Sequence, residues 1–240
     1  MLDAYERRAR LTPGLFAVAP VVVLLLALGI AKNPVVTAAL GVITAGAGAY
    51  LLSVAVANLG RRLQDGLWQS WGGAPTTQLL RVHSDASNLA QRTIWRSAIQ
   101  TVTSLELFTD ARELADPSRA DELITAAVGQ IRHLGQDDRY PLIAKENAQY
   151  GLERNLFGSR WLGRLLSLAC LVGLLISPVV TNQISTTLVI GVVLEVVLSV
   201  LWFIIPSSSR TKDAAFRYSE QLLQAVARES ATRTSEGGTR

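Results

Sequence analysis

The stretch GVVLEVVLSV, Gly191–Val200, places one carboxylate, Glu195, in the middle of an otherwise apolar run. The run extends from about residue 184 to residue 205, which is roughly 30 Å of helix and matches the hydrocarbon core of a bilayer. It therefore predicts a transmembrane helix with an ionisable group near its midpoint.

Three further apolar runs cover residues 15–31, 35–59 and 161–180. Of the 240 residues 49% are hydrophobic and 18% charged, and the apolar ones are gathered in blocks rather than spread as in a soluble domain. The first run is long for a signal peptide and lacks a small-residue cleavage site, which indicates a retained helix. We expect an all-α membrane protein with four transmembrane helices, arranged as two hairpins around a helical insert.

Positive charge near the apolar runs predicts the orientation. The gap between the first two runs holds only Lys32, whereas arginines gather at the opposite ends of all four runs. Since such residues favour the cytoplasmic side, both termini and the insert are expected there, in a cell inner membrane. The expected segments are an N-terminal hairpin (1–60), a cytoplasmic helical domain (61–159), a second hairpin (160–206) and a cytoplasmic amphipathic helix with a disordered tail (207–240).

The insert is expected to contain three helices. The first is capped by Ser84, Asp85 or Ser87, with its buried face formed by Leu89, Ile94, Ala98 and Val102. The second runs from Ser118 to Gly135, and the third begins near Pro141 and continues towards the membrane. Beyond the fourth run, residues 210–228 are expected to form an amphipathic helix and the chain from Glu229 to be disordered. Asn33-Pro34 and Ser177-Pro178 are expected in the two outer turns.

Two polar segments of the insert stand out by composition. WQSWGGAPTTQLLR, residues 68–81, combines two tryptophans with a glycine pair, and KENAQYGLERNLFG, residues 145–158, joins the insert to the third run. The first segment is either an ordered turn at the membrane interface or a ligand or partner contact. The binding candidates from the two segments are Trp68, Trp71, Gly72, Gly73, Pro75, Thr76, Tyr150, Arg154 and Asn155. We expect Arg154 and Asn155 to bond lipid headgroups or the glycine turn.

These two segments carry a family resemblance. Their patterns SWGG-x-PTT and EN-x-x-YG-x-x-RNL-x-G resemble those of a group of bacterial four-helix membrane proteins, and the resemblance spans most of the chain. It implies the four-helix layout and no defined activity. The layout is also similar to that of membrane effectors in antiphage systems, which is an architectural analogy.

The chain offers little for catalysis. His83 and His133 have no metal-ligand spacing, Cys170 is the single cysteine, and no phosphate-binding or nucleophile motif occurs. We therefore expect no enzyme activity, no cofactor and no bound metal. The net charge of +4 reflects the cytoplasmic arginines and does not indicate a nucleic-acid partner.

Small and polar residues recur every fourth position in two of the apolar runs. In the fourth run they are Thr187, Gly191, Glu195 and Ser199, and in the second run they are Gly41, Ala45, Ala49 and Ser53. Such stripes let membrane helices approach closely, which predicts tight packing and a homo-oligomer. No basic residue lies at the depth of Glu195, so the carboxyl is neutral interhelical glue, part of a cation-selective ring or part of a proton-coupled transporter.

Three functions follow from these patterns. The leading one is a homo-oligomeric pore-forming or membrane-perturbing effector, controlled by a cytoplasmic domain that senses a ligand or protein partner. The alternative is a membrane-anchored scaffold without transport activity. The third is an enzyme that uses Trp71, His83 and the acids of the insert, and it lacks a reactive constellation.

Overall fold

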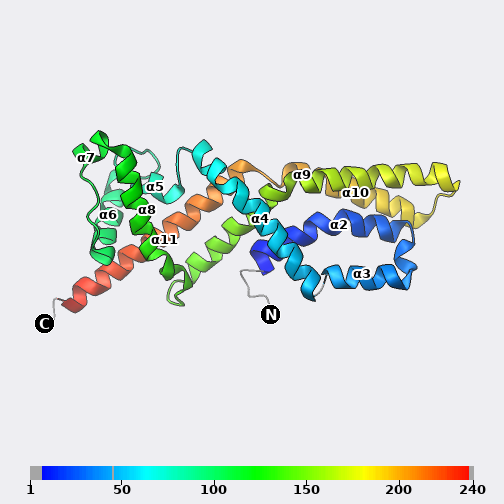
Figure 1. Cartoon of the computed structure of the whole chain (residues 1–240), viewed down its shortest axis with the longest axis horizontal. Coiled ribbons are helices and arrows are strands. Elements are labelled where there is room, and N and C mark those ends of the chain that lie inside the picture. Colours follow the sequence, from blue (N-terminus) through cyan, green and yellow to red (C-terminus); the bar gives the residue numbers. More distant parts are fainter. Residues whose placement is uncertain (1–6, 45, 238–240) are drawn as a thin grey trace. The chain divides into compact units, whose positions relative to one another are not determined.

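The computed structural model describes residues 7–44 and 46–237, and these residues form helices and connecting turns without any strand (Figure 1). The chain divides into two compact units, which we call the membrane unit (Met1–Asp65 and Ala148–Thr211) and the insert unit (Gly66–Asn147 and Lys212–Arg240). The elements in chain order are η1 (a π-helix, Arg7–Leu11), α2 (Thr12–Ala27), η2 (Ile30–Lys32), α3 (Pro34–Thr44), α4 (Gly46–Ser70), α5 (Pro75–Leu80), α6 (Leu89–Thr103), α7 (Asp110–Ala115), α8 (Pro117–Ile131), η3 (Arg132–Gln136), α9 (Pro141–Thr181), α10 (Thr186–Ile204) and α11 (Ser208–Gly237).

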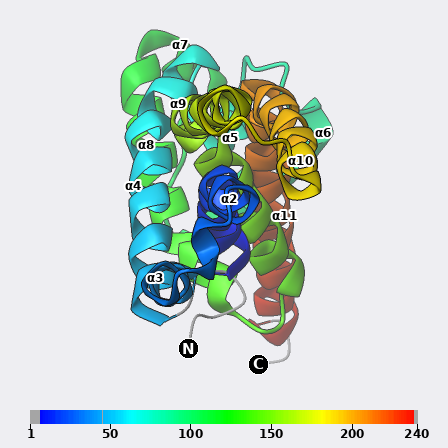
Figure 2. The same cartoon turned by 90° about the vertical axis from the view of Figure 1, so that its right-hand side faces the viewer.

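Three helices of the described chain are long and apolar enough to cross a membrane. They cover Arg7–Ala27, Pro141–Thr181 and Thr186–Ile204, and they correspond to the first, third and fourth apolar runs. Figure 2 looks nearly along α2, α9 and α10 and shows them as the corners of a triangle. The all-helical fold is therefore confirmed, together with three of the apolar helices.

The second apolar run, residues 35–59, is divided between α3 and α4. Residue 45, which separates the two helices, lies outside the described part of the chain. The sequence around it alternates alanine and glycine, and each glycine weakens a helix by about 1 kcal/mol relative to alanine. A single membrane-crossing helix over this run stays a prediction.

Of the two turns predicted from the sequence, the structure agrees with the one at Asn33-Pro34 and differs from the one at Ser177-Pro178. Asn33 ends η2, its Oδ1 accepts a hydrogen bond from the Val35 N–H at 2.9 Å, and α3 begins at Pro34, as the sequence predicts. The prediction for Pro178 is wrong, because this proline lies inside α9 and the helix continues to Thr181. A proline removes one hydrogen bond and crowds the carbonyl of the preceding turn, which can bend a helix without ending it. The left-handed backbone of Asn182 (φ 53°) ends α9.

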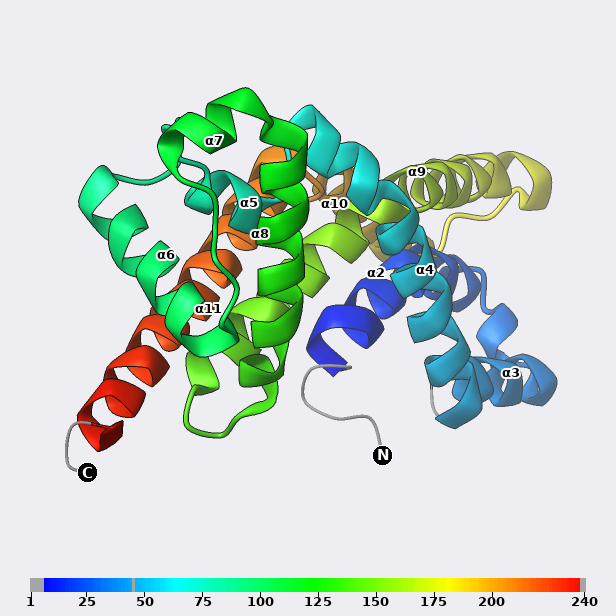
Figure 3. The ribbon, with the colours of Figure 1, turned by 60° about the vertical axis from the view of Figure 1, so that its left-hand side comes forward.

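The insert unit has a hydrophobic core to which α5, α6, α8 and α11 all contribute (Figure 3). The largest fully buried side chains in it include Leu79, Ile99, Ile124 and Leu222. The C-terminal helix α11 is thus part of the same core as the insert. The chain from residue 229 was expected to be disordered, but it is helical as far as Gly237.

Contacts within the insert unit explain this longer helix. The Glu229 carboxylate accepts a hydrogen bond from the Tyr140 hydroxyl at 3.2 Å and pairs with Arg139 at 3.1 Å. One turn later, the Arg233 guanidinium donates to the Val102 carbonyl at 3.2 Å. Composition alone does not reveal such partners, so it predicts disorder where the chain is helical.

The register of α6 also differs from the expectation. Its cap is Asn88, whose side chain accepts a hydrogen bond from the Gln91 N–H at 2.8 Å, instead of Ser84, Asp85 or Ser87. Leu89 and Ile94, predicted to be buried, are 70% and 54% exposed. The buried face consists of Arg92, Trp95, Ala98 and Ile99. By contrast, α8 lies close to the prediction and has a periodic buried face. It begins at Pro117 with Asp116 as its cap, just before the predicted start at Ser118, and it ends at Ile131, after which η3 continues past Gly135.

Candidate functional site

Glu195 lies on the one buried face of α10. The five buried residues of this helix follow a spacing of three or four positions, and they are Leu188, Gly191, Glu195, Ser199 and Trp202. Glu195 has no exposed surface, and neither of its carboxyl oxygens has a hydrogen-bond partner. A buried carboxyl without any partner is costly, so this position is the most unusual one in the membrane unit.

The helix α2 covers this face from one side. A Cβ on Gly191 would collide with the Cβ of Ala27, and the rings of Phe16 and Trp202 stack with centroids 4.5 Å apart. These contacts show that α2 and α10 run antiparallel and close together. Glu195 lies between the two contacts, level with the middle of α2.

The helix α9 covers the face from another side. A Cβ on Gly163 would collide with the Trp202 indole, and Leu174 packs with Leu188. Cys170, between these contacts along α9, is also buried. The described chain places no lysine or arginine within 4 Å of that carboxyl, as expected from the sequence.

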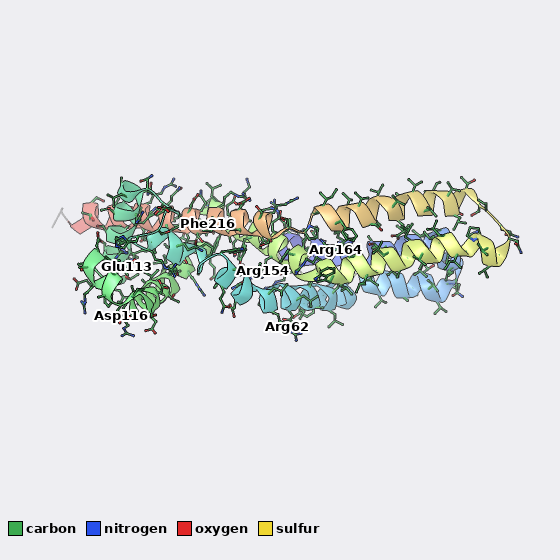
Figure 4. The ribbon with its side chains drawn as sticks, turned by 90° about the horizontal axis from the view of Figure 1, so that it is seen from above. Arg62, Glu113, Asp116, Arg154, Arg164 and Phe216 are labelled. Atoms are coloured by element: carbon green, nitrogen blue, oxygen red, sulfur yellow. The ribbon has the colours of Figure 1, made fainter. Side chains whose placement is uncertain are left out.

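Arg164 is the basic residue that comes nearest along α9 to this face. Its Nε donates to the Trp202 carbonyl at 3.2 Å, and its guanidinium lies over the Trp161 and Phe203 rings. Figure 4 labels Arg164. It therefore stabilises the last turn of α10, where free carbonyls favour a cation. It does not neutralise Glu195.

The remaining stripe residues are only partly brought together. Ala49 and Ser53 are buried on α4, which contacts α2 where a Cβ on Gly14 would meet Leu52. Gly41 and Thr187 are exposed, and the Thr187 hydroxyl lies 2.9 Å from that of Ser185 at the start of α10. The predicted stripe residue Ala45 lies outside the described part of the chain. Ala49 and Ser53 of α4, like most of the stripe of α10, are thus already buried within a single chain.

A second buried carboxylate, Glu153, was missed by the sequence analysis. It is 4% exposed, and its Oε1 accepts hydrogen bonds from Gln149 and Arg210, both at 3.0 Å. Gln149 in turn accepts a hydrogen bond from Arg8 at 2.7 Å. The only available signal was the EN-x-x-YG-x-x-RNL pattern around it. These bonds connect α9 to η1 and to the start of α11.

Arg154 and Asn155 bond partners within the membrane unit. Arg154, labelled in Figure 4, donates from Nη1 to the Gln64 side chain at 2.6 Å. Asn155, fully buried, donates from Nδ2 to the Ala9 carbonyl at 2.6 Å. A bond from either residue to a lipid headgroup or to the glycine turn stays a prediction. Tyr150 is also buried, with the Arg154 guanidinium 5.4 Å from its ring centre.

The two helices that carry these residues cross at a pair of glycines. A Cβ on Gly158 would lie 2.6 Å from the Gly60 nitrogen and 2.8 Å from the Leu59 carbonyl carbon. A Cβ on Gly60 would in turn collide with the Asn155 side chain. The backbones of α4 and α9 are therefore in direct contact, which is the close approach that glycine permits.

The glycine turn belongs to the insert unit and is bonded within it. Gly72 and Gly73 have φ of 91° and 127°, which few other residues adopt. The Arg81 Nη1 donates to the Gly72 carbonyl at 2.6 Å, and the same guanidinium forms two hydrogen bonds with Asp121, at 2.8 and 2.6 Å. The hydrogen bond to Asp121 raises the pKa of Arg81 above its usual value.

A pocket of about 230 Å³ opens beside this turn. Trp68, Gly73 and Thr76 line it, and the Trp68 indole N–H is buried without a partner. Trp71 is half-buried, and Pro75 starts α5 as a buried residue. Four binding candidates from the first segment thus lie around one pocket or begin the helix beside it.

The histidines remain apart from these sites. His83 and His133 are both exposed, and the His133 Nδ1 lies 2.8 Å from the Gln130 carbonyl. Within the described ranges no three histidine, cysteine or acidic side chains are grouped as metal ligands.

Comparison of the chain with protein-family models, with curated proteins and with solved structures finds no match. The function is therefore inferred from the sites described above.

Proposed function

We propose that the protein is an integral inner-membrane protein in which α2, residues 35–59, α9 and α10 form four membrane crossings. Exposed apolar side chains support this proposal, because Val179, Ile184 and Ile204 are each at least 66% exposed in the isolated chain. A surface of this kind is stable in lipid and unfavourable in water. The arginines at the ends of these helices support termini and an insert unit on the cytoplasmic side.

In this proposal the protein is a homo-oligomeric pore-forming or membrane-perturbing effector controlled by its insert unit. The observation that carries the idea is the burial of Glu195 without a partner among three apolar helices. A charged group at the centre of a membrane helix costs about 2.5–3.5 kcal/mol on insertion scales. The described arrangement would then be a resting state, and a rearrangement that exposes the carboxyl to water would favour an open state.

Other parts of the proposal follow from the same reasoning. The partners are the bilayer, further copies of the chain and a cytoplasmic ligand or protein, with no nucleic acid. The protein acts without catalysis and without a cofactor. A role in antiviral defence rests on the resemblance of the layout alone.

The test is the ionic current through planar bilayers that contain the purified protein. We expect discrete cation-selective steps in the wild type, and altered or absent steps in Glu195→Gln. The matched control is Val193→Ala, which shortens an exposed apolar side chain of α10 and should leave the current unchanged. Steps that are identical in wild type and Glu195→Gln would refute a role of the carboxyl in the conducting path.

A scaffold is the second candidate. It is favoured by the filling of the small-residue faces within one chain, since a packing role for Glu195 needs no second copy. In this case both proteins would be silent in bilayers, and crosslinking in native membranes would give only monomer.

A further inference from the structure

A second pocket of the insert unit lies between α6 and the segment leading to α7. Its volume is about 290 Å³, close to the lower limit for small-molecule sites. Apolar side chains, including Leu107 and Phe108, form part of its wall, and two arginines, Arg92 and Arg96, form another part. Its one acidic lining residue is Asp110, which is exposed at the start of α7. None of the binding candidates predicted from the sequence lines this pocket.

Arg92 is unusually buried for an unpaired cation. The residue is 7% exposed, and no carboxylate of the described chain lies within 4 Å of it. Its Nη2 donates to the carbonyls of Ser84 and Ser87, at 2.9 and 2.7 Å, and its Nε donates to the Ser87 hydroxyl at 3.4 Å. These bonds fix the guanidinium without neutralising its charge.

One nitrogen of this guanidinium faces the pocket. Nη1 of Arg92 donates no hydrogen bond in the described chain, yet it is not among the buried unpartnered atoms. It is therefore accessible, and the pocket that Arg92 lines provides the access. A fixed cationic donor in a partly open, partly apolar pocket is a good site for an anion, because the guanidinium is already held in place before binding.

Arg96 lies one turn along the same face of α6. Its Nη1 pairs with Glu113, labelled in Figure 4, at 2.9 Å and donates to the Leu80 carbonyl at 2.6 Å. Its Nη2 donates to the Phe108 carbonyl, so the arginine also holds the pocket wall in place. Glu113 offsets the charge of Arg96, whereas Arg92 has no carboxylate within 4 Å in the described chain.

We infer that this pocket binds a small organic anion, whose phosphate or carboxylate group bonds Arg92 and whose apolar part packs on Leu107 and Phe108. The inference rests on the proposed function, since such an anion would be the cytoplasmic signal that the insert unit senses. Anion binding is measured without a membrane current, so a failure of the proposed binding site can be told apart from a failure of the proposed channel.

The test is isothermal titration calorimetry of the full chain in detergent. The probes are phenyl phosphate and benzoate, which combine an anion with a small ring, together with phenol and inorganic phosphate as the separate parts. We expect at least one of the two combined probes to bind at least tenfold more tightly than either part.

Two variants examine the role of the arginine. Arg92→Gln should weaken binding by about 10- to 100-fold, the usual effect of losing a hydrogen bond to a charged group. Ser97→Trp fills the pocket from an exposed position of α6 and keeps the bonds of Arg92, so it should abolish binding even if Arg92→Gln folds poorly. The control Arg119→Gln removes an exposed arginine of α8 and should bind as the wild type does.

Three results would overturn the inference. They are no binding of either combined probe at millimolar concentration, unchanged binding in a folded Ser97→Trp variant, and equal weakening in Arg119→Gln. If phenyl phosphate binds and benzoate does not, the anionic group is a phosphate, and the reverse result identifies a carboxylate. Binding with silent bilayers would support the pocket and remove the channel.

Discussion

Replacing Gly158 by alanine tests the crossing of α4 and α9. The new Cβ would lie 2.6–2.8 Å from backbone atoms of Leu59 and Gly60, whereas carbon atoms at rest are about 3.5–4.0 Å apart. Backbone cannot swing aside as a side chain can, so the two helices must separate by roughly 1 Å. The separation would also stretch the bond from Arg154 to Gln64.

The magnitude follows from two opposing terms. Overpacking of this kind costs about 1–3 kcal/mol, and the exchange of glycine for alanine in a helix returns up to about 1 kcal/mol. We expect a net loss of about 1–2 kcal/mol, which for a chain of this length lowers the melting temperature by roughly 2–8 °C. The assay is thermal unfolding in detergent, followed by helical circular dichroism.

The matched control is Gly66→Ala on α4, where an added Cβ has no neighbour within 4 Å. It should be neutral or stabilising by up to about 1 kcal/mol. If Gly158→Ala is as stable as Gly66→Ala, the direct backbone contact between α4 and α9 at Gly60 and Gly158 is refuted.

Three further predictions concern other positions. Arg139 holds the pKa of Asp137 below its usual value through its side-chain hydrogen bonds. This contact therefore contributes stability above the ordinary pKa of about 3.9, and the contribution is lost as the pH falls through the lower folded pKa. Arg139→Gln should move the titration of the Asp137 carboxyl, followed by NMR, to higher pH, and an unchanged midpoint would disprove the pairing. Asn155→Ala removes a buried hydrogen bond to η1 and should lower the free energy of unfolding by about 1–3 kcal/mol. The control Asn58→Ala, at an exposed position, should change it by less than about 0.5 kcal/mol. Equal effects of the two variants would contradict the hydrogen bond from Asn155 to η1. Gly163→Ala would push against a buried indole of α10, so tryptophan fluorescence should shift and stability should fall; an unaltered spectrum and melting curve would rule out this contact.

The helices of the insert show what a single sequence can predict. The helix α8 was located by the regular spacing of its apolar residues, although it begins at Pro117 with Asp116 as its cap instead of at the predicted Ser118. The helix α6 was misplaced because the periodic pattern admits two registers and Arg92, normally a surface residue, belongs to the buried face. Burial of Arg92 depends on carbonyls of the preceding loop, which no local pattern encodes.

The membrane unit shows the same division. The cost of a carboxyl in lipid predicts that Glu195 faces protein, and the structure places it against α2 and α9. The crossing of Gly60 with Gly158 could not be predicted, because each glycine is ordinary in its own segment and the contact joins distant parts of the chain. The buried Glu153 was missed for a similar reason, since its partner Arg210 lies beyond both helices of the second hairpin.

The most direct test of the central claim, a four-crossing membrane protein with a cytoplasmic insert unit, is the labelling of single cysteines in intact cells. In a Cys170→Ala background, cysteines replace Asn33, Asn182 or Ser118, all of which are exposed. We predict that a membrane-impermeant maleimide labels positions 33 and 182 from outside and labels position 118 only after permeabilisation. Labelling of position 118 in intact cells, or protection of position 33 or 182, would contradict this account.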